Sequence, residues 1–193
     1  MFKLPRLFLA LLAVLALPVQ ANWYLDNESS RLSFITNKNG DVTEVHRFLV
    51  LHGKVDSKGA AELQIEMDSV NSGIPLRDER MRKDLFEVAR FPDALIRAQL
   101  DLRPIKDLAN GAQLELRLPV TVSLHGKDHS YSAQLLATRL DERRFQVVTL
   151  EPLMLRAEEF DLAPGLDALR KVAGLQSISL SVPVGAVLIF TAR

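Results

Sequence analysis

The chain has 193 residues, with 24 basic and 24 acidic side chains and no cysteine. Its length suits one domain with a substantial core. The balanced charge argues against a nucleic-acid partner, which usually leaves a basic footprint. Without cysteine there is no disulfide, so the apolar core alone must hold the fold.

The N-terminal segment differs in composition from the rest of the chain. Two basic residues precede an unbroken apolar run, residues 7–17, and small side chains lie just before Asn22. This pattern predicts a cleaved secretory signal peptide, residues 1–21, and a mature domain, residues 22–193, in the periplasm. An uncleaved anchor is the alternative, but the apolar run is shorter than the about 20 residues that span a bilayer. We therefore expect a protein that is not integral to the membrane.

The first half of the mature domain predicts strands joined by turns. An extended segment covers residues 23–34, and the sequence Asn-Lys-Asn-Gly-Asp at 37–41 is a strong turn signal. The next predicted strand, residues 45–53, places Phe48, Val50 and His52 on one side. Both of its sides are largely apolar, so we expect burial on both faces or beneath a helical crossover.

A charged crossover connects the next two predicted strands. Residues 61–67 alternate strictly between apolar and polar side chains, and residues 94–101 alternate apart from Leu95, with Ile96 on the apolar face. Between them, a Gly-Ile-Pro break precedes good helix formers over residues 77–85. The sequence therefore predicts a lid-like helix between two strands. The apolar face of the first strand carries Leu63, Ile65 and Met67.

The second half contains the clearest strand pattern and a second helix. Residues 114–124 alternate without a break, although Pro119 predicts a bulge or bend. His125 and Gly126 predict a hairpin turn into another strand, and single strands are predicted at 144–155 and 178–190. Apolar residues at helical spacing predict a short helix near residues 164–173. The apolar face of the long strand is Leu114, Leu116, Leu118, Val120, Val122 and Leu124.

Seven or eight antiparallel strands with two helical insertions predict an all-β fold with minor helices. Closure into an extended barrel is favoured over an open sheet because it removes exposed edges. A barrel of about eight strands is either filled by side chains or holds one small ligand. The sequence pattern leaves both outcomes open. Inward alanines indicate unfilled space, though tapered barrels also use them; they are Ala61, Ala94, Ala98, Ala133 and Ala137.

Catalytic and metal-binding patterns are weak. His125 and His129 flank a turn, while His46 and His52 would lie roughly 20 Å apart on one strand face, at about 3.3 Å per residue. Neither spacing makes a compact metal site, so we expect turn or surface histidines and no metal or cofactor. Nucleophile motifs and Gly-rich phosphate loops are lacking as well. No catalytic residue is therefore predicted, and we expect a protein that is not an enzyme.

The charges of the predicted lid offer a candidate ligand contact. Arg77 and Asp78 could form an ion pair that holds the lid over the barrel, or Arg77 could bind the anionic head group of a ligand. The structural role is the commoner one for a charged helix, and we favour it. Phe86 and Phe91 are predicted to be apolar plugs that seat the lid on the barrel.

The order of residues in this crossover resembles the signature of the YceI-like family. The residues concerned are Ser69, Ser72, Arg77-Asp78, Met81-Arg82, Asp84-Leu85-Phe86 and Arg90-Phe91-Pro92. The similarity extends to residues 23–34 and 48–53 and to the Leu-His-Gly turn at 124–126, and it weakens after about residue 150. The resemblance implies a secreted bacterial protein with an extended lipocalin-like antiparallel barrel. In that family the barrel holds a long apolar ligand, typically an isoprenoid.

On this resemblance, the leading hypothesis is a periplasmic binding or carrier protein for a polyisoprenoid, an isoprenoid quinone or a similar lipid. Two alternatives stay open: an enzyme or accessory factor acting on such a lipid, with Asp78 or His52 transferring protons, and a ligand-free structural or stress-response barrel. The expected partner is a lipid, and a homodimer is left open. The predicted tunnel and mouth residues are Phe34, Phe48, Val50, Leu63, Ile65, Met67, Arg77, Asp78, Phe86, Phe91, Ile96, Leu116, Leu118 and Val120.

Overall fold

The computed structural model describes residues 22–193, so the predicted signal peptide lies outside the described residues. Three α-helices are present in this part of the chain: α1 (Pro75–Arg80), α2 (Arg103–Lys106) and α3 (Ala163–Val172). The strands are β1 (Trp23–Leu25), β2 (Arg31–Lys38), β3 (Val42–Phe48), β4 (Leu51–Val55), β5 (Ala60–Glu66), β6 (Val70–Asn71), β7 (Asp93–Gln99), β8 (Gln113–Leu124), β9 (Lys127–Arg139), β10 (Arg144–Thr149), β11 (Leu153–Arg156) and β12 (Ser181–Ala192).

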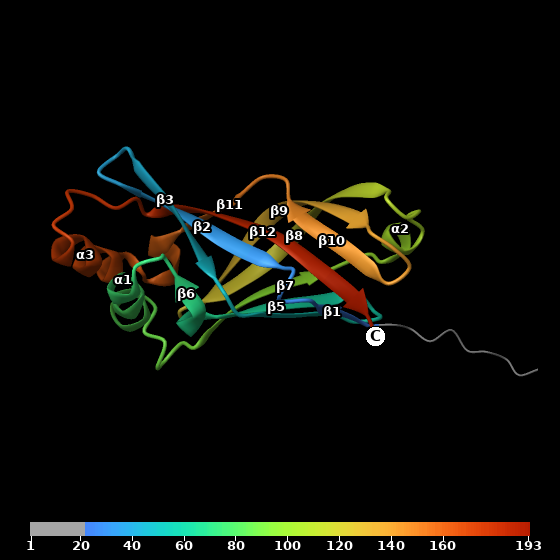
Figure 1. Ribbon diagram of the computed structural model, residues 1–193, viewed down its shortest axis with the longest axis horizontal. Coiled ribbons are helices and arrows are strands. Elements are labelled where there is room, and N and C mark those ends of the chain that lie inside the picture. Colours follow the sequence, from blue (N-terminus) through green and yellow to red (C-terminus); the bar gives the residue numbers. More distant parts are fainter. Residues whose placement is uncertain (1–21) are drawn as a thin grey trace, which may run out of the picture.

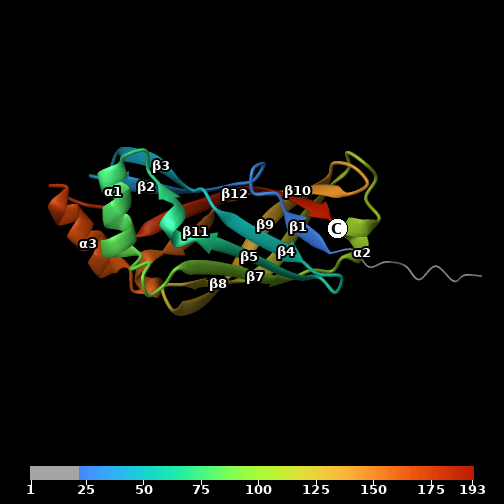
Figure 2. The same cartoon turned by 60° about the horizontal axis from the view of Figure 1, so that its bottom comes forward.

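The molecule is elongated, with helices at both ends of a twisted sheet. Figure 1 shows α1 and α3 at one end and α2 with the C-terminus at the other. In Figure 2 α1 and α3 again lie side by side, at what we call the helical end. α1 continues into a π-helical turn, Met81–Leu85, and we call the two together the lid (residues 75–85). The lid crossover and the second helix are both where the sequence predicts them.

The sheet closes on itself through β12. Within residues 22–193, eight strands form a ring in the order β1-β4-β5-β7-β8-β9-β10-β12, which closes where β12 pairs with β1. One edge of β12 pairs first with β2 and then with β1, while its other edge pairs with β11 and β10. All these pairings are antiparallel, which confirms the predicted closed, lipocalin-like barrel.

The predicted strand at 45–53 is wrong as a single strand. The structure divides it into β3 and β4 at Leu49 and Val50, and the side chain of Ser69 accepts hydrogen bonds from both of their N–H groups, each at 3.1 Å. Asn27 Oδ1 accepts from the Leu51 N–H at 2.7 Å. These side chains replace the sheet partners, and the break reverses the alternation. Leu51 is therefore buried, and Val50 does not continue the inward row of β3.

Two further expectations are corrected. β8 runs through Pro119 without a bulge, with Pro119 opposite Ser132 in an unbroken ladder to β9. The ladder to β7 ends at Val120, so the proline lies just outside the pairing that its missing N–H would weaken. The predicted strand at 144–155 is two strands, because the chain leaves the ladder around Pro152. The short helix α2 was not predicted.

Apolar alternation places the core as expected in most strands. Leu63 and Ile65 are buried in the main cluster, and Met67 is buried too, although it belongs to a 3-10 turn rather than to β5. A smaller cluster beneath α2 contains Val55, Phe145 and other apolar side chains. The core is therefore spread along the whole barrel.

α3 and the lid approach each other closely at Gly165. A Cβ on this residue would lie 2.6 Å from the carbonyl oxygen of Asp84 and 2.9 Å from Leu85 Cα. These atoms belong to backbone and cannot rotate away. The contact between α3 and the lid therefore requires glycine at this position.

We expect Gly165→Ala to destabilise the protein by about 1 to 3 kcal/mol, the usual cost of overpacking. Alanine is the better helix former by about 1 kcal/mol, so the sign of the change reports the backbone contact directly. Thermal unfolding checks this expectation. The matched control is Gly185→Ala, whose Cβ would meet only Thr149 Oγ1 at an ordinary 3.5 Å; equal melting temperatures for the two variants would contradict the assignment.

Candidate functional site: an apolar cavity along the barrel

Side chains do not fill the interior of the barrel. A cavity of about 280 Å³ lies at the helical end, and a second of about 180 Å³ lies toward α2. We call them the helical-end cavity and the far-end cavity. Leu32, Ile96 and Val184 line both, so the two cavities are neighbours along the barrel. Of the outcomes that the sequence left open, the structure shows the hollow one.

The helical-end cavity reaches the surface beside the lid. Ile74 and Leu76 line it and are 50% and 56% exposed. Its roof includes Leu166 and Leu169 of α3. Their helical spacing predicts the helix, but nothing in the sequence shows that this helix covers the cavity.

Most predicted site residues line one of the cavities. Ile96 lines both, as noted above. Val50, Asp78 and Phe91 line neither, which corrects their predicted placement. Those in the helical-end cavity are Phe34, Phe48, Ile65, Met67, Arg77 and Phe86. Those in the far-end cavity are Leu63, Leu116, Leu118 and Val120.

The two predicted plugs have different surroundings. Phe86 is buried beneath the lid, with its ring centroid 5.8 Å from that of Phe48. Phe91 instead packs on the β8–β9 turn, 4.3 Å from the ring of His125. A Cβ on Gly126 would lie 3.0 Å from the Phe91 ring. Phe91 therefore holds the end of the crossover against the hairpin rather than closing the cavity.

Arg77 and Asp78 are held by Ser72 rather than by each other. Arg77 donates to Ser72 Oγ at 2.7 Å and to the Ser72 carbonyl oxygen at 2.8 Å. Asp78 accepts from the Ser72 N–H at 2.8 Å and from the Ser72 hydroxyl. The ion pair of Arg77 is with Glu44 Oε2 at 2.6 Å, 33 positions away in β3. The sequence identified the charged lid but not the strand residue that it binds.

Glu44 joins the lid to the β2–β3 hairpin. It accepts from Lys38 as well as from Arg77. The hydrogen bond from Lys38 is the main reason that the pKa of Glu44 lies below its ordinary value, and the charge of Arg77 acts in the same direction. At the tip of this hairpin, Asn39 Oδ1 accepts from the Gln176 N–H at 2.8 Å, just after α3. The hairpin therefore anchors the lid and also the segment that follows α3.

His46 is a buried polar residue in the helical-end cavity. Its exposed fraction is 2%, and its ring lies 5.2 Å from that of Phe34. His46 Nε2 forms a hydrogen bond with Thr36 Oγ1 at 2.9 Å, whereas Nδ1 has no partner among the described residues. Burial, followed by the charge of Arg77, lowers the pKa of His46. The ring is therefore neutral at pH 7, and the expected surface position was wrong.

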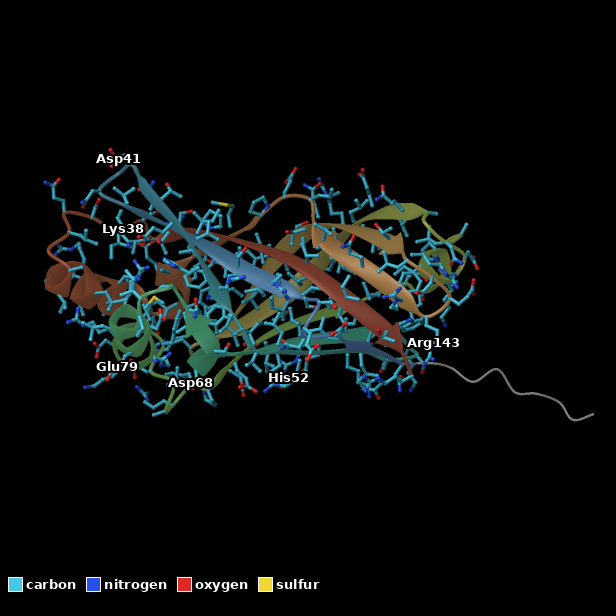
Figure 3. All side chains as sticks on the ribbon, in the orientation of Figure 1. Lys38, Asp41, His52, Asp68, Glu79 and Arg143 are labelled. Atoms are coloured by element: carbon cyan, nitrogen blue, oxygen red, sulfur yellow. The ribbon has the colours of Figure 1, made fainter. Side chains whose placement is uncertain are left out.

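Two of the other histidines are where the sequence predicts them, His125 at the β8–β9 turn and His52 on the surface. His125 is largely covered, with Nδ1 3.1 Å from the Phe160 carbonyl oxygen. His52 is exposed on the outer face and pairs with Glu66 at 2.8 Å. Figure 3 shows His52 at the lower edge of the barrel, away from the helical end where Lys38 lies. Neither His52 nor Asp78, the two proton-transfer candidates, lines a cavity.

Within residues 22–193, no group of three or more histidine, aspartate or glutamate side chains is arranged to hold a metal ion. In the same range, no helix has the length and hydropathy needed to cross a bilayer. The polar and charged side chains that line the helical-end cavity are those of Thr36, Lys38, His46, Arg77 and Arg80.

Comparison with known proteins identifies several similar structures. The family model for the YceI-like domain matches residues 23–188. A polyisoprenoid-binding domain from Saccharophagus degradans, implicated in plant cell wall breakdown, is 37% identical, with a TM-score of 0.87 over 89% of this chain and 98% of that one. BcnA of Burkholderia cenocepacia shares the fold, at 15% identity and a TM-score of 0.65 over 86% of this chain and 98% of that one. No curated protein sequence matches the chain.

The position of Glu44 predicts an acid-dependent loss of stability. A group with a depressed pKa in the folded state stabilises the fold above its unfolded pKa, and this contribution is lost as the pH falls through the folded value. We therefore expect Glu44→Gln to lower the melting temperature at neutral pH and to flatten its decline toward acid pH. Thermal unfolding across this range is the measurement. Glu115→Gln, at an exposed position of β8, is the control and should follow the wild type; parallel curves for Glu44→Gln would contradict the role of Glu44.

Proposed function

The chain belongs to the YceI-like family, and on that premise we propose that it is a periplasmic carrier protein that binds a long isoprenoid lipid inside its barrel. The observation that supports this most directly is the pair of neighbouring apolar cavities along the barrel. Such a shape suits an extended chain rather than a compact molecule. Each methylene group of the lipid that is buried in these cavities would contribute about 0.8 kcal/mol to the free energy of binding.

The ligand class is supported by the similar structure from Saccharophagus degradans. That domain is described as polyisoprenoid-binding, and the match covers nearly all of it. A polyisoprenoid or an isoprenoid quinone has the extended apolar chain that the two cavities here would accommodate. We infer that the isoprenoid chain of the ligand occupies both cavities and passes between Leu32, Ile96 and Val184.

We further propose that the protein binds and carries its ligand rather than transforming it. The proton-transfer candidates Asp78 and His52 lie outside both cavities. Lys38 and Arg77, which line the helical-end cavity, are both bound by Glu44, as expected for an anchor of the lid. A carrier also fits the predicted export of the chain, because a lipid in the periplasm needs a shield from water. The homodimer stays a prediction.

The experiment that tests this function is extraction of the protein after purification from its natural host. Native mass spectrometry of the intact complex, followed by solvent extraction, should release an isoprenoid lipid in proportion to the protein. The same spectra should show a chain that begins at Asn22, which checks export and cleavage. Protein that contains no lipid and takes up no prenyl compound in vitro would refute the carrier function.

Ligand length offers a sharper prediction. Val184 lies where the two cavities meet, so Val184→Phe should block the passage between them. We expect this variant to lose about tenfold or more in affinity for a long polyprenol, since each 1.4 kcal/mol is a factor of ten and several methylenes would lose their contacts. Binding of a short prenol that fits one cavity should change much less.

The matched control is Val187→Phe on the same strand. Val187 lines neither cavity, so this variant should bind long and short prenols as the wild type does. Fluorescence titration with both prenols gives the comparison. If Val184→Phe kept its full affinity for the long prenol, the ligand would not pass through both cavities.

A further inference from the structure

One side chain that lines the helical-end cavity is left with an unpartnered polar atom by the protein itself. His46 is almost fully buried, and its Nε2 is occupied by Thr36. Its Nδ1 is covered by protein atoms and forms no hydrogen bond among the described residues. Leaving such a group unsatisfied is costly. A ligand group would meet Nδ1 once the imidazole ring turns this atom toward the cavity, and the hydrogen bond would then be satisfied.

The charges around His46 cancel one another. Lys38 and Arg77 are the cations, and Glu44 binds both of them. Asp78 is the second carboxylate of this cluster, held at Ser72. An anionic head group placed beside His46 would meet the Glu44 carboxylate, which lies 3.7 Å from His46 Nε2, and both cations of this cluster are already bound to that carboxylate. Burying an unbalanced charge is costly.

The imidazole of His46 suits an uncharged head group, whether that group donates or accepts a hydrogen bond. A neutral imidazole has one donor and one acceptor nitrogen, and the Thr36 hydroxyl can take either role. Nδ1 can therefore donate to a quinone carbonyl or accept from the hydroxyl of a prenol. Because its pKa is lowered by burial and by the charge of Arg77, the ring keeps this versatility at neutral pH.

We propose that His46 binds the uncharged polar head group of the isoprenoid lipid through Nδ1. This assignment rests on the proposed function and gives the ligand a direction. The head group lies in the helical-end cavity, beneath the lid. The isoprenoid chain of the ligand then runs past Leu32, Ile96 and Val184 into the far-end cavity.

The alternative is an anionic head group bound by the lid. Arg80 lines the helical-end cavity and forms no ion pair among residues 22–193. A prenyl diphosphate would be expected to use this guanidinium and to be insensitive to the imidazole. His46 and Arg80 therefore separate the two chemistries.

The test uses three probes that share one chain and differ in the head: farnesol, farnesyl diphosphate and the hydrocarbon farnesene. Wild-type protein should prefer farnesol to farnesene. His46→Phe keeps an aromatic ring beside Phe34 but removes the nitrogen, so it should lose about five- to tenfold in affinity for farnesol, the worth of one hydrogen bond. Its affinity for farnesene should not fall. His52→Phe, the same change on the outer face, should leave both affinities as they are.

The outcomes distinguish this inference from the proposed function. If the wild type binds farnesol and farnesene equally, the carrier function stands and the assignment of His46 is overturned. If His46→Phe lost affinity for farnesol and farnesene equally, the assignment would be overturned as well. It would also be overturned if farnesyl diphosphate bound most tightly of the three probes and Arg80→Ala abolished that binding. If none of the three binds, the proposed function fails.

A second measurement takes its readout from the wild-type protein and uses the variants only for assignment. Nitrogen-15 NMR of histidine-labelled wild-type protein follows His46 directly, and the His46→Phe and His52→Phe spectra assign its signals. Farnesol should shift the Nδ1 resonance of His46, whereas farnesene should leave it in place. An Nδ1 resonance that farnesol does not move would overturn the proposal.

Discussion

The structure depends on the closure of its sheet by β12. This strand runs along the whole barrel and uses each of its edges twice, with β2 and β1 on one side and β11 and β10 on the other. Closure satisfies the backbone groups that an open sheet would expose. It also fixes the width of the barrel, because eight strands around a ring leave an interior wide enough for a ligand. Whether that interior is filled is then decided by the inward side chains, which here leave two cavities.

The two ends of the barrel solve different physical problems. At the far end, α2 and Trp23 cover a small apolar cluster around Phe145, and the far-end cavity lies among the same side chains. At the helical end, the lid and α3 form the roof of the other cavity and bury apolar side chains such as Met81, Leu85 and Leu166. This roof is also fixed at its margins, through Arg77 to Glu44, through Asn39 to the segment after α3, and through Gly165 to the lid.

This anchoring places charged groups beside an apolar site, and their mutual pairing makes the arrangement tolerable. Buried charges are costly unless they are paired and hydrogen-bonded. Lys38, Arg77 and Glu44 meet that condition, so the margin of the cavity is polar but electrically balanced. His46, neutral and half-satisfied, is the residue where the apolar interior meets this margin. With His46 as the proposed ligand contact, the stability of the roof and the recognition of a ligand involve the same few residues.

The sequence by itself determined the local features of this protein. Alternation identified the inward faces of β5, β7, β8 and β9, the His-Gly pair identified the β8–β9 turn, and the pattern near Pro164 identified α3. These signals are contained within a few residues, and the family signature added the closed barrel. Tertiary structure decided what depends on distant partners. The break after Phe48 needs Ser69 and Asn27, the partner of Arg77 is in β3, and His46 is buried against Phe34 of the neighbouring strand β2. Alternation shows which side chains point inward, but not whether they fill the interior. That depends on the side chains of the strands that face them across the ring, so the sequence alone could not show that the barrel is hollow.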